Sequence, residues 1–253
     1  ATQLHGKQPL VKSFGLESIS ENKQLYLCMV EQLASNVSDR LLNDSLVRRS
    51  GALIDIQPLN QLDDEFDDLE TFAKDFRANV AVILGEYEEI KLQKIAARLS
   101  PYVGSHIINL PKLSGTIESD DVYRRSLHSS AIREYFYGTD QTVLSPYAVG
   151  VDYEDITVWK HKTILEDQGL SQEASSTELI PVEIDPSNLQ HALVAISYAN
   201  RKAPASEVAG ASLLGFGLIT EVNEKRRKIR ILLPVPGNLP NKALILTSYR
   251  YLE

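Results

Sequence analysis

The sequence is poor in cysteine, in long apolar runs and in net positive charge. Cys28 is the only cysteine among 253 residues, which excludes intrachain disulfides and zinc sites built from several cysteines and favours a reducing compartment. No apolar run approaches the roughly 18 residues of a membrane-spanning helix, so we expect no membrane partner. Lys and Arg number 26 against 34 Asp and Glu, a net charge of −8, so any contact with RNA must be local.

The motifs that commonly bind nucleotides are also missing. A P-loop, G-x-x-x-x-G-K-[ST], requires Gly-Lys, and the one such pair, Gly6-Lys7, is followed by Gln8. The glycine pair Gly215-Phe216-Gly217 has Thr220 where a dinucleotide-binding loop needs its third glycine. Without a loop of backbone N–H groups, this chain on its own has no evident way to hold a triphosphate.

The first part of the chain alternates between helical and strand patterns. Apolar residues at helical spacing predict a helix over 20–42 that begins with Ser20 as its N-cap. Three short apolar runs separated by two amphipathic helices predict buried strands connected as in a parallel sheet. The predicted strands are 52–54, 80–84 and 106–110, and the predicted helices are 66–76, 90–99 and a basic helix over 119–136.

Beyond Gly138, short alternating runs separated by turn residues replace the helical pattern. They predict an antiparallel sandwich or barrel. We therefore expect an α/β part over 1–140, with a partial P-loop-NTPase-like parallel sheet, followed by an all-β part over 141–253. The predicted strands are 147–152, 155–160, 178–184, 192–199, 213–222, 227–233 and 243–251, with a helical turn at 187–191 and loops at 166–177 and 201–209.

Asp55 follows the apolar run 52–54, at the end of a predicted parallel strand. Ligands of such sheets bind at the carboxyl ends of the strands, and an acid at this place holds Mg²⁺ in Walker B motifs. From this pattern alone, Asp55 is either a ligand of Mg²⁺ and nucleotide or an exposed acid that caps a neighbouring turn.

Two basic clusters leave two interpretations each. Arg124, Arg125 and Arg133 lie on one predicted helix, spaced to offer cations toward one region in front of the sheet. They either stabilise phosphate charge, as arginines do in kinases, or form salt bridges along an exposed face. Residues 224–230, E-K-R-R-K-I-R, form the tip of a predicted hairpin. They either contact RNA phosphate or an acidic partner, or they are solvated charges that protect an exposed strand.

Several long motifs resemble one known family. The segment I-R-E-Y-F-Y-G at 132–138 follows Y-R-R at 123–125 and precedes L-S-P-Y at 144–147 and V-D-Y-E-D-I-T at 151–157. With the terminal T-S-Y-R-Y-L-E at 247–253, these motifs resemble the polynucleotide 5′-hydroxyl kinase-like subunit of pre-mRNA cleavage factor IA. The resemblance covers essentially the whole chain and is strongest to fungal members.

The resemblance implies a protein of three parts: a β-domain, a central P-loop ATPase domain and a C-terminal β-domain. On that plan this chain would be truncated and begin inside the central domain, after the phosphate-binding loop. The resemblance places Asp55 on the Walker B strand, near ATP and Mg²⁺ in the intact protein. It also implies that Arg124, Arg125 and Arg133 face the phosphates from a lid over 120–138, and that this chain alone binds neither ATP nor Mg²⁺.

The lid departs from that of the active RNA kinases in the family. Their lid helix is richer in arginine, whereas this one has H-S-S-A at 128–131 between Arg125 and Arg133. The resemblance therefore implies a non-catalytic, ATP-binding scaffold subunit of the nuclear complex that cleaves and polyadenylates pre-mRNA 3′ ends. Its expected partners are the large cleavage-factor subunit that also binds the polymerase tail and other subunits of the complex. The alternative is an active ATP-dependent RNA 5′-hydroxyl kinase.

Overall fold

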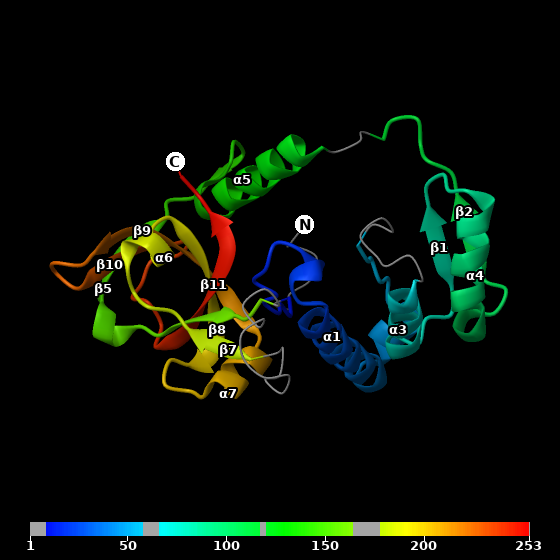
Figure 1. The fold of residues 1–253 in the computed structure, drawn as a ribbon, viewed down its shortest axis with the longest axis horizontal. Helices are drawn as coiled ribbons and strands as arrows, with labels where there is room; N and C mark the ends of the chain where they lie inside the picture. The colour runs from blue at the N-terminus through cyan, green and yellow to red at the C-terminus, as the bar shows by residue number, and fades with distance from the viewer. Residues whose placement is uncertain (1–8, 58–65, 117–119, 164–177, 253) are drawn as a thin grey trace. The chain divides into compact units, whose positions relative to one another are not determined.

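The computed structural model describes residues 9–57, 66–116, 120–163 and 178–252. The chain divides into an α/β unit, Leu27–Glu118, and a β unit, which combines Ala1–Tyr26 with Ser119–Glu253. Figure 1 labels most of the helices and strands of both units. The predicted loop 166–177 lies outside the described residues. Within the described ranges, no helix has the length and apolar character needed to cross a bilayer.

The α/β unit contains a two-stranded parallel sheet. Strands β1 (Ala81–Leu84) and β2 (Ile107–Leu110) pair with Ala81 opposite Ile107. Helix α4 (Glu89–Val103) connects them and buries an apolar face that includes Ile95. The strand–helix–strand connection predicted from the periodicity is therefore confirmed for this part of the chain.

Helix α3 (Asp67–Asp75) packs against α4. Arg98 on α4 forms an ion pair with Asp67 at 2.9 Å, and the Tyr102 hydroxyl donates a hydrogen bond to Glu70 Oε1 at 2.7 Å. This hydrogen bond is the main cause that raises the pKa of Tyr102 above its usual value. Polar contacts thus align the two helices beside their apolar interface.

The predicted strand at 52–54 is wrong. Leu53 is 97% exposed, and the segment after helix α2 (Ser45–Ser50) pairs with no strand that the structure describes. An apolar run becomes a buried strand only where a neighbour satisfies its backbone hydrogen bonds and covers its side chains. The described parallel sheet accordingly has two strands rather than three.

The N-cap predicted for the first long helix is also wrong. Ser18 caps a short helix, η1 (Ile19–Glu21), and helix α1 (Lys23–Asn43) begins only afterwards. At its start Asn22 Oδ1 accepts a hydrogen bond from Leu25 N at 3.0 Å. Asn22 is 1% exposed, so this polar side chain is buried while it caps the helix.

The β unit is built on one seven-stranded sheet with the order β5-β10-β9-β8-β11-β6-β7. Every neighbouring pair is antiparallel except β11 with β6. All seven strands predicted from the sequence are present, with shorter bounds for β6 and β7. The strands are β5 (Tyr147–Asp152), β6 (Val158–His161), β7 (Leu179–Pro181), β8 (Ala192–Asn200), β9 (Leu213–Asn223), β10 (Lys228–Leu233) and β11 (Lys242–Arg250).

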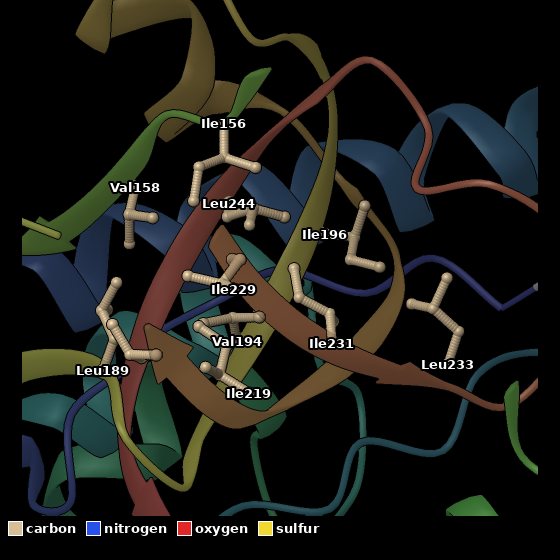
Figure 2. Packing of buried hydrophobic residues seen from close by; sticks show 11 residues of the cluster. Ile156, Val158, Leu189, Val194, Ile196, Ile219, Ile229, Ile231, Leu233 and Leu244 are labelled. Carbon is tan, nitrogen blue, oxygen red and sulfur yellow. The ribbon is translucent and has the colours of Figure 1, made fainter. Parts of the chain in front are cut away.

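One apolar core lies inside this sheet, which curls on itself (Figure 1). Figure 2 shows the core side chains converging from strands that are distant in the sequence. Strand β5 at one edge and strand β6 near the other edge contribute to the same cluster. A flat sheet cannot bring its edges to one core, so burial of the alternating apolar side chains requires the curl. Fully or almost fully buried members include Val158, Leu189, Val194, Ile219, Ile231 and Leu244.

Further helices and a hairpin complete the β unit. The loop predicted at 201–209 is wrong, because the segment contains helix α7 (Ala205–Gly210). Val208, 0% exposed, packs this helix against the apolar cluster on β8 and β11. The predicted helical turn at 187–191 is present as α6. The remaining elements are α5 (Asp121–Tyr137), β3 (Gly138–Thr139), β4 (Thr142–Val143), η3 (Tyr153–Asp155) and α6 (Pro186–Leu189).

Residues 9–22, which we call the N-terminal strap, are bound to the sheet of the β unit. Val11 O accepts a hydrogen bond from the first residue of β9 at 2.9 Å, and Gly15 O accepts one from Ser248 N at 3.0 Å. Asn22 Nδ2 donates to Lys162 O at 2.9 Å. The start of the chain thus packs with its end, an arrangement that periodicity does not reveal.

Candidate functional site

Helix α5 carries the three arginines that the resemblance places opposite phosphates. Asp120 caps the helix by accepting a hydrogen bond from Tyr123 N at 2.7 Å. Arg124, Arg125 and Arg133 are all exposed. The helix is uninterrupted, so ideal geometry decides the directions in which these side chains leave its axis.

The three arginines do not share one side of α5. Arg124 and Arg133 are nine residues apart, and at about 100° per residue they leave the helix in nearly opposite directions. Arg125 and Arg133 are eight residues apart, which turns them only about 80° from each other and separates them by about 12 Å along the axis. A single polyanion on one side of α5 therefore meets Arg125 and Arg133 more readily than all three.

Aromatic side chains hold the last turn of α5 on the sheet. Phe136 is 0% exposed and packs in a cluster with Leu218 of β9 and Leu232 of β10. Tyr135 Oη accepts a hydrogen bond from Phe216 N at 3.0 Å, and the two rings meet edge to face at 5.9 Å. We call Tyr135, Phe136 and Phe216 the aromatic anchor. The sequence marked Tyr135 and Phe136 only as part of a family motif and Phe216 only as the residue between two glycines, and it did not predict the contact.

Two glycines make this packing possible. A Cβ atom at Gly138 would lie 2.0 Å from Thr142 O, and the residue has φ +80°, which favours glycine. A Cβ atom at Gly215 would lie 2.8 Å from Tyr135 Oη. The glycine pair at 215 and 217, which fails to match a dinucleotide-binding loop, therefore lies where α5 and neighbouring strands approach β9 closely.

Asp55 is exposed in the α/β unit, in a segment that is not a strand. It belongs to a different unit from the three arginines, so the structure defines no shared site for these four residues. In the described part of the chain, no group of three or more His, Cys, Asp or Glu side chains has the arrangement of a metal site. One carboxylate fits Mg²⁺ only together with phosphate oxygens and waters, and the role of Asp55 stays a prediction.

Three of the five basic residues at 225–230, in the hairpin between β9 and β10, contact side chains of the β unit. Lys228 lies 3.3 Å from Asp152 on β5, and Arg230 lies 3.2 Å from Glu221 on β9. The Arg227 guanidinium lies over the Tyr153 ring at 5.4 Å. These contacts favour the interpretation as charges that protect exposed strands.

His161 is the described group whose pKa is most strongly changed in the β unit. It is 3% exposed at the end of β6, beside Gly15 of the N-terminal strap. Burial lowers its pKa from 6.5 to about 4, opposed in part by the nearby backbone of Ser13. Neither ring nitrogen has a hydrogen-bond partner that meets ordinary geometry within the described residues. The ring is therefore neutral at physiological pH and contributes to packing.

Two family models match the chain. One described as "mRNA cleavage and polyadenylation factor CLP1 P-loop" matches residues 1–138, and one described as "Pre-mRNA cleavage complex II protein Clp1" matches residues 144–253. These matches divide the chain near residue 140, whereas the compact units place α5 with the β unit. The boundary near residue 140 stays a prediction.

Curated and solved relatives agree with these matches. The mRNA cleavage and polyadenylation factors CLP1 of Vanderwaltozyma polyspora and Saccharomyces cerevisiae (strain S288c) are 56% and 50% identical, and each comparison covers 100% of this chain and 56% of the relative. Clp1p in the wild-type Clp1p–Pcf11p complex is 50% identical with a TM-score of 0.90, covering 100% of this chain and 58% of that one. A second structure, concerned with an extended Pcf11p–Clp1p interface and a point mutant that loses ATP, matches equally well. This chain thus spans little more than half the length of these relatives, and it belongs to the Clp1 family of pre-mRNA cleavage and polyadenylation factors.

Proposed function

We propose that the protein is a non-catalytic, ATP-binding-type scaffold subunit of nuclear cleavage factor IA and acts in pre-mRNA 3′-end cleavage and polyadenylation. The observation that carries this proposal is the likeness of the whole chain to Clp1p solved together with Pcf11p. The proposed partner is therefore a Pcf11-like large subunit, the one that also binds the polymerase tail. The protein would work by holding subunits of the complex together.

The geometry of α5 supports assembly over phosphoryl transfer. Kinases concentrate cations around the transferred phosphoryl group, and one well-placed arginine contributes roughly 10³–10⁵ to the rate where it stabilises the transition state. On α5, Arg124 leaves the helix on nearly the opposite side from Arg133, and residues 128–131 between Arg125 and Arg133 carry no arginine. A lid with two arginines toward one side suits retention of a bound nucleotide better than catalysis.

In the intact protein, the nucleotide would be ATP with Mg²⁺. Asp55 would hold the ion together with phosphate oxygens, and Arg124, Arg125 and Arg133 are the candidate phosphate contacts, with the last two better placed to act together. The ion would neutralise phosphate charge when bound. These residues would orient the phosphates beside a P-loop that the present sequence does not contain.

Co-purification with the Pcf11-like subunit tests the scaffold role. We expect the intact protein to form a stable complex with this subunit and to retain it through size-exclusion chromatography. Failure of the intact protein to bind the large subunit would overturn the proposal.

An active RNA 5′-hydroxyl kinase is the second candidate, favoured by the match to a P-loop family model and by the arginines on α5. The test is transfer of labelled γ-phosphate from ATP to a 5′-hydroxyl RNA by the intact protein. Transfer above background that Asp55→Ala abolishes, and that the exposed control Asp140→Ala leaves unchanged, would replace the scaffold proposal by the kinase. We expect no transfer above background.

A further inference from the structure

A tyrosine on α5 and a glycine on β9 form a close contact that joins the arginine-bearing helix to the sheet. Tyr135 Oη accepts a hydrogen bond from Phe216 N at 3.0 Å, and it lies 2.8 Å from the position that a Cβ atom at Gly215 would occupy. The Tyr135 ring is in edge contact with both Phe136 and Phe216, at centroid distances of 5.0 and 5.9 Å. Although Tyr135 is 37% exposed, the two ring contacts and the hydrogen bond hold its side chain against β9.

This contact acts in a direction that the other contacts of α5 do not cover. Phe136, 0% exposed, and Ile132 pack in the same apolar cluster, and the His128 ring meets the Tyr249 ring edge to face at 5.2 Å. His128, Ile132 and Phe136 are spaced by four residues and form one row along the helix, so these contacts hold α5 along a single line. The hydrogen bond of Tyr135 fastens a neighbouring side chain that leaves the helix about 100° away. Contacts in two different directions fix the angle of the last turn of α5 about the helix axis.

We propose that Tyr135 and Gly215 are positioning residues that fix the rotation of α5 and thereby the direction of Arg133. Arg133 lies two residues before Tyr135 on the same uninterrupted helix, so a rotation of the last turn moves its guanidinium directly. The part of the proposal that concerns nucleotide rests on the proposed ATP-binding role of the arginines. The β unit would then decide where the lid presents its positive charge.

Hydrogen exchange of the backbone amides of α5 tests the contact in the intact protein. Gly215→Ala places a methyl group against Tyr135 Oη, and we expect exchange in residues 131–137 to become about tenfold faster, the effect of losing roughly one hydrogen bond. The control is Gly150→Ala, which also introduces a Cβ on a strand of the same sheet but meets nothing within 4 Å. Equal exchange in these two variants would overturn the proposal.

A double variant separates this contact from a general weakening of the strand. Tyr135→Phe removes the hydroxyl that both accepts the hydrogen bond and meets the new methyl group, so Gly215→Ala should add no further exchange in that background. Effects that multiply in the double variant would show that the glycine acts elsewhere, which would overturn the proposal.

The amount of ATP that co-purifies with the intact protein provides the functional readout. We expect Gly215→Ala and Arg133→Ala to lower it several-fold and Gly150→Ala to leave it unchanged. If Arg133→Ala lowers the ATP content and Gly215→Ala does not, the positioning role is overturned. If Arg133→Ala retains all its ATP, the proposed nucleotide role of α5 fails, while hydrogen exchange still decides whether the contact fixes the helix.

Discussion

Mild acid should destabilise the protein through one buried histidine, His161. The structure holds its ring neutral, because burial lowers its pKa to about 4, whereas the unfolded chain protonates it near the ordinary value of 6.5. Between pH 6.5 and 4 the unfolded state therefore binds more protons than the folded state. The free energy of unfolding must fall as the pH falls through this range.

The size of this effect follows from the difference between the two pKa values. A lowering from 6.5 to about 4 corresponds to about 3 kcal/mol of stability, which is fully present above pH 6.5 and is lost by about pH 4. Between pH 7.5 and pH 5, the contribution of His161 falls by about 2 kcal/mol. This loss should be visible, because domain stabilities are commonly only about 5–15 kcal/mol.

The variant His161→Leu isolates this contribution, because it removes the titrating ring and keeps an apolar side chain on β6. Urea unfolding at pH 7.5 and at pH 5 can be followed through Trp159, the only tryptophan, which lies on the same strand. We expect the wild type to lose about 2 kcal/mol more than His161→Leu between the two pH values. The exposed control His128→Gln should behave like the wild type. Equal pH dependence in the wild type and His161→Leu would refute the reasoning.

Three further predictions concern the anchor, the turn after α5 and the basic hairpin. Phe136→Ala should lower the free energy of unfolding by about 3–5 kcal/mol, because it empties a fully buried site; a loss below about 1 kcal/mol would contradict the burial. Gly138→Ala should lower the melting temperature more than Gly104→Ala, since both residues have positive φ but only the first has a carbonyl oxygen in the way. Lys228→Glu should lower the free energy of unfolding by about 1 kcal/mol or less, because it places a second carboxylate opposite Asp152 on the neighbouring strand. Arg226→Glu should leave both stability and RNA binding unchanged. Weaker RNA binding by Arg226→Glu in a filter assay would favour the interpretation of the hairpin as an RNA contact.

Strand and helix positions followed from the sequence wherever one side of an element is buried within its own unit. The alternating pattern of β10 and the helical stripe of α4 each face a core that the same unit supplies. The apolar run at 52–54 has the composition of a strand but no described neighbour, and so it is exposed. An apolar composition means that a segment can be buried in a sheet, but it is buried only if another strand pairs with it.

The candidate site was only partly accessible from the sequence. Arg124, Arg125 and Arg133 were grouped on one predicted helix and again through the resemblance, and the structure shows that this helix continues from Asp121 to Tyr137, so that Arg124 and Arg133 leave it on nearly opposite sides. In the basic hairpin, Lys228 and Arg230 form ion pairs with carboxylates on β5 and β9. The run of basic residues in the sequence therefore suggested more unpaired cations than the structure has at these two positions. Such contacts depend on register between strands, which a pattern within one segment does not contain.

The sequence by itself determined the family, the α/β and all-β character of the two parts, and most helices and strands, because these depend on local spacing and on long specific motifs. Tertiary structure alone decided that Tyr135 and Gly215 meet across 80 residues of chain, that the N-terminal strap covers His161, and that Asp55 follows no strand. The physical reason is the same in each case. Burial and hydrogen bonding at these positions depend on atoms brought close by the fold, and distance along the chain says nothing about them.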